Sequence, residues 1–261
     1  MLTETLIDAK RSDWTIPQNW ARFTPAEHRV WDLLFARQSR ALEGRAVADF
    51  FRGLEVLRLS KPGIPDFEEL NERLFARTGW SVVSVPGLVP DEIFFAHLAA
   101  RRFPAGNFIR GADSLDYIEQ PDVFHDVFGH VPLLALPAVA DFMQAMGEAG
   151  LAAAKAGALH RLARLYWYSV EFGLARESGG VRIYGAGLLS SLGESRFALE
   201  SETVRRSRFE LRRVLRTRYR SDSFQRAYFI LDGLDDLPRL LEEADLGELY
   251  RELAEVPDLE P

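Results

Sequence analysis

The sequence contains no cysteine and only five histidines among its 261 residues. Disulfides, iron–sulfur clusters, thiolate zinc sites and a cysteine nucleophile are therefore excluded. The chain also lacks a charge-free apolar run of about 18 residues, the length that a membrane helix requires. Its first residues show no basic stretch followed by an apolar core, so no secretory signal is predicted. We therefore expect a cytoplasmic protein without a membrane partner.

An excess of positive charge is lacking as well, because the formal net charge is −7. This balance argues against nucleic acid as a partner. The exception is the segment 205–220, where arginines cluster. We interpret this cluster as the solvated face of a helix whose charge is balanced by neighbouring acidic residues.

The residues that are present have the balance of an ordinary globular protein, with 47% hydrophobic and 27% charged residues. Helical periodicity dominates, and strand-like runs are few and short. We therefore predict a mostly α fold with a few short β-strands. We expect a single domain over residues 24–245, an N-terminal arm over residues 1–23 packed on the body, and a short C-terminal tail over residues 246–261.

The limits of the helices and strands are predicted from capping residues and from residues that interrupt these elements. Thr24-Pro25-Ala26-Glu27 forms a capping box with proline at the first helical position, which predicts a helix from Pro25. Further helices are predicted over residues 46–57, 66–78, 90–102, 138–156, 158–176, 195–215 and 235–243. Short strands are predicted over residues 81–85, 107–110, 181–184 and 227–231.

Two of the five histidines, His125 and His130, lie in a helical segment that begins at Pro121. On an ideal α-helix, residues five apart point about 140° away from each other, so the two imidazoles do not share a face. We expect Gly129 to end this helix in a left-handed cap, with Pro132 preventing its continuation. The bend would then bring His130 back beside His125. The alternative is two unrelated histidines, one buried and one at the surface.

A carboxylate, Glu171, stands in an otherwise apolar and aromatic helical segment. Burying it is costly unless it is paired or bound to a metal. It either forms a buried ion pair with an arginine or joins His125 and His130 in a metal site. Two imidazoles and one carboxylate form the set that holds Fe(II) in non-haem oxygenases and leaves coordination positions open. The same set can hold zinc, which would imply hydrolysis.

Three segments, in this order and spacing, resemble the pterin-dependent aromatic amino acid hydroxylases. They are residues 125–130 (His-Asp-Val-Phe-Gly-His), 166–174 (Tyr-Trp-Tyr-Ser-Val-Glu-Phe-Gly-Leu) and 184–191 (Tyr-Gly-Ala-Gly-Leu-Leu-Ser-Ser). Residues 16–18, 27–31, 65–67 and 85–91 are similar to the bacterial members. The resemblance implies an aromatic amino acid hydroxylase-like catalytic domain. It implies that His125, His130 and Glu171 are both the ligands of Fe(II) and the catalytic centre.

The resemblance also implies two organic binding sites. A flat apolar slot would take tetrahydrobiopterin or a related tetrahydropterin, and the matching residues are Val89, Asp91, Phe94, Asp126, Ala163 and Tyr166. The amino acid would contact a second set, namely Arg110, Pro121, Trp167, Phe172, Gly187 and Ser190. In this set Arg110 matches the arginine that holds the substrate carboxylate, a task that suits a bidentate guanidinium.

The implied activity is a monooxygenase that hydroxylates L-phenylalanine to L-tyrosine with O₂, as in phenylalanine catabolism. Trp167 favours phenylalanine or tyrosine, because tryptophan-specific members tend to carry phenylalanine at that position. The resemblance also implies a monomer. The alternatives are the same chemistry on L-tryptophan or L-tyrosine, a zinc hydrolase, and an inactive protein that binds pterin and amino acid.

Overall fold

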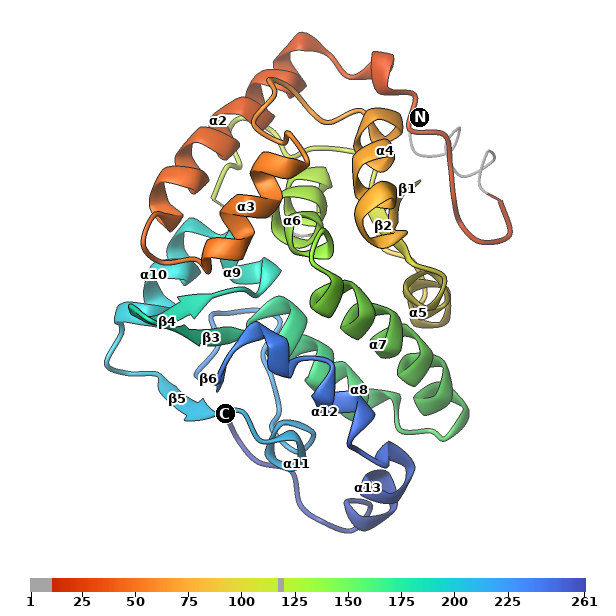
Figure 1. Ribbon diagram of the computed structural model, residues 1–261, viewed down its shortest axis with the longest axis vertical. Helices are drawn as coiled ribbons and strands as arrows, with labels where there is room; N and C mark the ends of the chain where they lie inside the picture. Colours follow the sequence, from red (N-terminus) through yellow and green to blue (C-terminus); the bar gives the residue numbers. More distant parts are fainter. Residues whose placement is uncertain (1–10, 117–119) are drawn as a thin grey trace.

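The computed structural model describes residues 11–116 and 120–261, and about half of these residues are helical (Figure 1). The α-helices are α2 (Pro25–Leu42), α3 (Ala48–Val56), α4 (Phe67–Thr78), α5 (Asp91–Ala99), α6 (Val131–Leu134), α7 (Pro137–Lys155), α8 (Leu159–Tyr166), α9 (Ala186–Ser190), α10 (Leu192–Glu200), α11 (Leu211–Val214), α12 (Arg239–Glu242) and α13 (Leu246–Glu252). Two π-helices, η2 (Phe124–His130) and η3 (Trp167–Glu171), and two short 3₁₀ turns, η1 (Trp20–Arg22) and η4 (Leu234–Asp236), complete the helical elements of the described residues.

The strands of the described residues form two small sheets. Strands β1 (Ser81–Val85) and β2 (Arg102–Gly106) pair in parallel, with Ser81 opposite Arg102. The second sheet has the order β4-β3-β6-β5. Its strands are β3 (Leu174–Glu177), β4 (Gly180–Ile183), β5 (Arg205–Arg208) and β6 (Ala227–Leu231). Only β3 and β4 are antiparallel. The predicted class, a mostly α fold with a few short strands, is confirmed.

The capping box that was predicted from the sequence begins α2. The Thr24 side chain accepts from the Glu27 backbone N–H, and the Glu27 carboxylate accepts from the Thr24 backbone N–H at 2.7 Å. The predicted strands over residues 81–85, 181–184 and 227–231 are present within a residue or two of the expected limits. Local sequence signals were sufficient for this helix start and for these three strands.

Two predicted elements are wrong. Residues 107–110 are not a strand; the strand in this region, β2, lies just before them. It contains Pro104, and proline is tolerated in an edge strand such as those of a two-stranded sheet. Residues 195–215 are not one helix, because α10 ends at Glu200 and the arginines of 205–208 form strand β5. Among the described strands it pairs with β6 alone, and charged side chains are common on such edges. The arginine cluster is therefore not a helix face.

Two further helices are shorter than predicted. The helix that begins at Leu159 becomes a π-helix at Trp167 and ends at Glu171, and strand β3 follows it. The predicted helix over residues 235–243 divides into η4 and α12, with Pro238 between them. Proline lacks the N–H that a continuous helix needs at this position.

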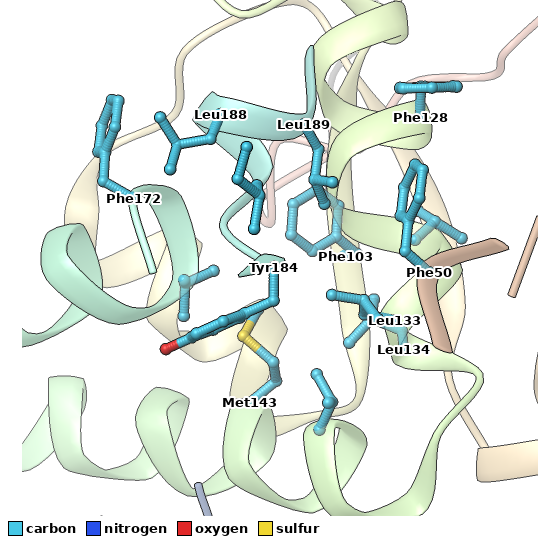
Figure 2. Packing of buried hydrophobic residues seen from close by; sticks show 14 of the residues in the cluster. Phe50, Phe103, Phe128, Leu133, Leu134, Met143, Phe172, Tyr184, Leu188 and Leu189 are labelled. Atoms are coloured by element: carbon cyan, nitrogen blue, oxygen red, sulfur yellow. The ribbon is translucent and has the colours of Figure 1, made fainter. Parts of the chain in front are cut away.

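The hydrophobic core is one continuous cluster that joins the helical part to the larger sheet. Figure 2 shows a section of it, in which Met143 lies beside the side chain of Tyr184. The π-helix η2 is buried along its whole length in this core, with Phe124 and Phe128 stacked at 4.7 Å. Two of the metal-ligand candidates, His125 and His130, therefore lie in a closely packed part of the core.

Both ends of the described chain pack on the body. Residue Ile16 donates its backbone N–H to the Ser84 carbonyl, and the Asp13 carbonyl contacts His97 Nε2 at 2.8 Å. Residues 1–10 of the predicted arm lie outside the described residues. At the other end, α13 is followed by a segment that pairs with Thr217 through Leu259. In the described part of the chain no single helix is long and apolar enough to cross a membrane; Phe124–Leu134 and Pro137–Lys155 pass that test only together, across a bend of 117°.

Candidate active site

The two histidines are brought together by a π-helix rather than by a helix end. The prediction that Gly129 terminates the helix is wrong, because η2 runs through it to His130 and continues into α6. A π-helix bonds residue i to i+5, so residues five apart become neighbours on one face. The rings of His125 and His130 lie 5.2 Å apart, centroid to centroid. The angular argument from α-helix geometry does not apply to this segment.

Gly129 has a packing function in this arrangement. A Cβ atom at this position would lie 2.9 Å from the carbonyl oxygen of Ala186 and 3.1 Å from its Cβ. The glycine therefore lets η2 approach α9 closely, at the residue that precedes His130.

Glu171 is the last residue of the second π-helix, η3. The backbone N–H of Phe172 donates to the Trp167 carbonyl across five residues, which closes the wide turn. Glu171 Oε1 lies 3.2 Å from His130 Nε2, and Glu171 Oε2 lies 3.7 Å from His125 Nε2. One ligand atom from each of these three residues can be chosen so that all lie within 4.8 Å of one another.

The protonation states suit a metal site. Burial lowers the pKa of His125 to about 4, so its imidazole is neutral near pH 7. Burial alone would raise the pKa of Glu171, but the neighbouring His130 and His125 and a hydrogen bond from Tyr166 outweigh it and hold the pKa at about 2. Two imidazoles and one carboxylate are a donor set for Fe(II) or another divalent transition metal. The residues present therefore fit a bound iron.

A serine fixes the orientation of His125. Ser190 Oγ lies 2.8 Å from His125 Nδ1 and 2.8 Å from the Ala186 carbonyl oxygen. Because the carbonyl can only accept, Ser190 donates its proton there and accepts from the Nδ1–H of His125. This tautomer leaves Nε2 free to bind a metal.

A cavity of about 290 Å³ opens beside the three candidate ligands. Most residues that the sequence assigned to the pterin and amino acid lie in its wall. They are Val89, Asp91, Phe94, Pro121, Asp126, Ala163, Tyr166 and Trp167. Phe94 packs edge-on against Tyr166 with their ring centroids 5.5 Å apart, so the wall is aromatic near the ligands.

Asp126 lies between this wall and the smaller sheet. Burial raises the pKa of Asp126 to about 7, although its carboxylate accepts the backbone N–H of Gly106 at 2.7 Å. Asp126 follows His125 in η2 and lines the cavity.

Four residues that the sequence assigned to the amino acid are absent from the wall of this cavity. Arg110 is buried and donates from Nε and Nη2 to Asp122, at 2.8 Å each. Phe172 lies behind Trp167, with ring centroids 5.1 Å apart, and Gly187 leaves room for the Phe172 ring. Ser190 contacts His125, as described above.

The sequence analysis missed Tyr219, which also lines the cavity. Its ring stacks on Trp167 at 4.3 Å with an angle of 20° between the planes. Tyr219 follows an irregular arginine-rich segment about fifty positions after Trp167, and no local pattern marks it.

Comparison with known proteins agrees with this geometry. The family model for biopterin-dependent aromatic amino acid hydroxylases matches residues 7–246. The chain belongs to this family, and the predicted resemblance is confirmed.

Family members similar to this chain include phenylalanine hydroxylases. The phenylalanine-4-hydroxylase of Caulobacter vibrioides is 55% identical over 249 residues, which cover 95% of this chain and 84% of the relative. Phenylalanine hydroxylase of Chromobacterium violaceum with bound iron (III) and 7,8-dihydrobiopterin has a TM-score of 0.93 and 46% identity, covering all of this chain and 94% of the other. The iron- and phenylalanine-bound structure of that enzyme also has a TM-score of 0.93, with 44% identity over all of this chain and 96% of the other.

Proposed function

We propose that the protein is an iron- and tetrahydropterin-dependent phenylalanine 4-monooxygenase. It would convert L-phenylalanine, O₂ and a tetrahydropterin to L-tyrosine and a hydroxylated pterin. The observation that carries the proposal is the juxtaposition of His125, His130 and Glu171, on an aromatic cavity, in a chain of this family. When bound, iron and tetrahydropterin would supply the oxygen chemistry, with one oxygen atom of O₂ going to the ring and the other to the pterin.

The chain's own residues would hold and orient the reactants. His125, His130 and Glu171 would bind Fe(II) and leave its remaining positions directed at the cavity. Phe94 and Tyr166 offer aromatic faces for the pterin ring, and Val89, Asp91, Asp126 and Ala163 lie around them.

The amino acid would occupy the side of the cavity next to Trp167 and Pro121. Arg110 donates to Asp122 from Nε and Nη2 and to the Leu115 carbonyl from Nη1. A guanidinium has five N–H groups, so two remain, and these would bind the substrate carboxylate. Three further residues of this set would help to position the side chains that face the cavity. Phe172 and Gly187 lie behind Trp167, and Ser190 contacts His125. The enclosed apolar wall would exclude water from the reacting groups.

The first test is a product assay. Fe(II)-loaded protein is incubated with O₂, a tetrahydropterin and one amino acid at a time: phenylalanine, tyrosine or tryptophan. The products are identified by mass spectrometry. We expect one added oxygen on phenylalanine, and only when both iron and pterin are present. Oxygen added only to tryptophan or tyrosine would overturn the substrate, and no product from iron-loaded protein would overturn the activity.

The second test concerns the ligands. His125→Ala, His130→Ala and Glu171→Ala should each lose iron and turnover while the far-ultraviolet circular dichroism stays that of a folded protein. His160→Ala is the matched control, because His160 is outside the cavity wall. A ligand variant that keeps both iron and activity would contradict the assignment.

We further propose that the protein acts as a monomer in the cytoplasm, with only small molecules as partners. Size-exclusion chromatography with light scattering tests the first part, and a molar mass near 29.6 kDa is expected. Fractionation of cells that express the protein tests the second part.

A further inference from the structure

The C-terminal segment of residues 257–259, which we call the strap, lies alongside residues 216–218. The backbone N–H of Arg218 donates to the Leu259 carbonyl at 2.9 Å, and the Leu259 N–H donates to the Arg216 carbonyl at 2.8 Å. The Arg216 guanidinium also donates to the Pro257 carbonyl. In Figure 1 the C-terminus lies beside the end of β5 and close to α11. The strap therefore holds the segment that leads directly into Tyr219.

The same segment is also bound to the helix that carries Glu171. Tyr168, in η3, donates its hydroxyl proton to the Arg218 carbonyl at 2.5 Å. Arg164, in α8, donates to the Leu215 carbonyl at 3.1 Å and to both carboxylate oxygens of Asp258 at 2.7 Å. Strap, segment and helix thus form one hydrogen-bonded unit.

Tyr219 is the point at which this unit reaches the cavity. Its ring stacks on Trp167, and both residues line the cavity wall. The indole N–H of Trp167 is buried and has no hydrogen-bond partner within the described residues. The indole is therefore positioned by packing, with Tyr219 against one part of the ring and Phe172 against another.

We propose that Tyr219 is a specificity-determining residue for the aromatic ring of the amino acid, and that the strap is the element that positions it. This inference rests on the proposed function, because it assigns the Trp167 side of the cavity to the amino acid. Loss of the Tyr219 ring frees the Trp167 indole to move and widens that side. The pterin side, with Phe94 and Val89, keeps its own wall.

The first experiment compares Tyr219→Leu with Tyr219→Phe. Tyr219→Leu removes the stacked ring, so the KM for phenylalanine should rise about tenfold, the upper end of what an aromatic pair contributes. The KM for the pterin and the iron content should change less than twofold. The preference for phenylalanine over tryptophan should fall, because the wider pocket admits the larger ring. Tyr219→Phe keeps the stacked face and should restore the KM for phenylalanine toward the wild-type value.

Binding without turnover provides an independent measurement. Isothermal titration calorimetry of phenylalanine into the Tyr219→Leu protein, loaded with cobalt in place of iron, should show a Kd raised by the same factor. Tyr250→Leu is the matched control, since Tyr250 is a half-buried tyrosine outside the cavity wall. This control should leave the Kd for phenylalanine unchanged.

The second experiment tests the strap at one position. Leu259→Pro removes the N–H that donates to the Arg216 carbonyl, whereas Leu259→Ala trims the side chain and keeps that N–H. Leu259→Pro should reproduce the rise in the KM for phenylalanine, and Leu259→Ala should not. Thermal unfolding of both variants shows whether the rest of the molecule stays folded.

The outcomes separate this inference from the proposed function. Wild-type protein that forms tyrosine supports the activity, whatever the variants do. If it does so and Tyr219→Leu leaves the KM and the Kd for phenylalanine unchanged, the inference is overturned. It is also overturned if the KM for the pterin rises instead, or if Leu259→Pro and Leu259→Ala behave alike.

Discussion

At the scale of single residues, Ser190 contacts a candidate metal ligand and also belongs to the set predicted to contact the amino acid. The resemblance assigned it to the amino acid, whereas the structure places its hydroxyl between His125 and the Ala186 carbonyl. A residue that fixes the tautomer of a metal-binding histidine affects the binding of the metal directly.

Replacement of this serine tests that distinction. Ser190→Ala removes the acceptor of His125 Nδ1–H, so the iron affinity should fall by about 10- to 100-fold, as is usual for such partners. Iron binding is measured by competition with a chelator. Ser195→Ala is the control, because Ser195 is a buried serine that donates only to a helix carbonyl. Unchanged iron affinity with weaker phenylalanine binding would instead support direct contact with the substrate.

Glu194, which is outside the cavity wall, predicts a pH dependence of stability. It is buried and accepts hydrogen bonds from the Gln225 backbone N–H and the Tyr228 hydroxyl, at 2.9 Å each. Burial raises its pKa to about 6, from an ordinary value of 4.5. Between these values the folded protein binds more protons than the unfolded chain does.

The free energy of unfolding should therefore decrease as the pH rises from about 4.5 to about 6, by up to about 2 kcal/mol. In Glu194→Gln, which keeps an acceptor oxygen but cannot titrate, this decrease should disappear. Urea unfolding at several pH values measures both. If the free energy of unfolding depends on pH in the same way in both proteins, groups other than Glu194 determine the pH dependence.

At the scale of elements, the two π-helices explain why the site was found from the sequence although its geometry was not. The residue types and their order identify His125, His130 and Glu171 as candidates. The backbone that joins them could not be predicted, because π turns are rare and no residue type specifies them.

The backbone at Gly185 lies close to the end of the second π-helix, η3, and the need for a glycine at this position is testable. A Cβ at this position would lie 2.3 Å from the Gly173 nitrogen and 2.4 Å from the Glu171 carbonyl oxygen. Because both atoms belong to the backbone, Gly185→Ala must displace the end of η3. We expect a loss of about 1–3 kcal/mol in stability, together with weaker iron binding.

Gly233→Ala is the matched control, since nothing lies within 4 Å of a Cβ at that glycine. Chemical denaturation and metal titration of the two variants give the comparison. If Gly185→Ala has the stability and iron affinity of the control, the proposed close approach is wrong.

The predicted secondary structure failed where neighbours distant in sequence determine the element. The residues of β2 include a proline and those of β5 are mostly arginine, so neither has a strand signature. Each becomes a strand because one partner strand lies beside it. The helix α2, in contrast, carries its own cap and its own apolar face.

At the scale of the whole molecule, the last residues of the chain stabilise a buried pair of charges. Arg161 and Arg164 have only 8% and 9% of their side chains exposed, and Asp258 lies 3.8 and 2.7 Å from them. A buried guanidinium that loses its partner is costly. No sequence signal joins positions about ninety residues apart, so this contact could not have been predicted.

Asp258→Ala should therefore destabilise the protein by about 3 kcal/mol. Differential scanning calorimetry should show a lower Tm, by about 6–12 °C at this chain length. Asp222→Ala provides the comparison, because Asp222 forms an exposed ion pair with Arg220 and its removal should leave the Tm unchanged. Similar Tm values for the two variants would mean that Asp258 does not stabilise the arginines.

The π-helix η2 also has a consequence for how gaps in aligned sequences are interpreted. A separation of five on a π-helix corresponds to a separation of four on an α-helix, where residues share a face. A deletion of one residue between His125 and His130 would leave a His-x₃-His pair on an ordinary helix, with both imidazoles still on one side. A one-residue gap inside this motif is therefore compatible with two imidazoles on one face of the helix.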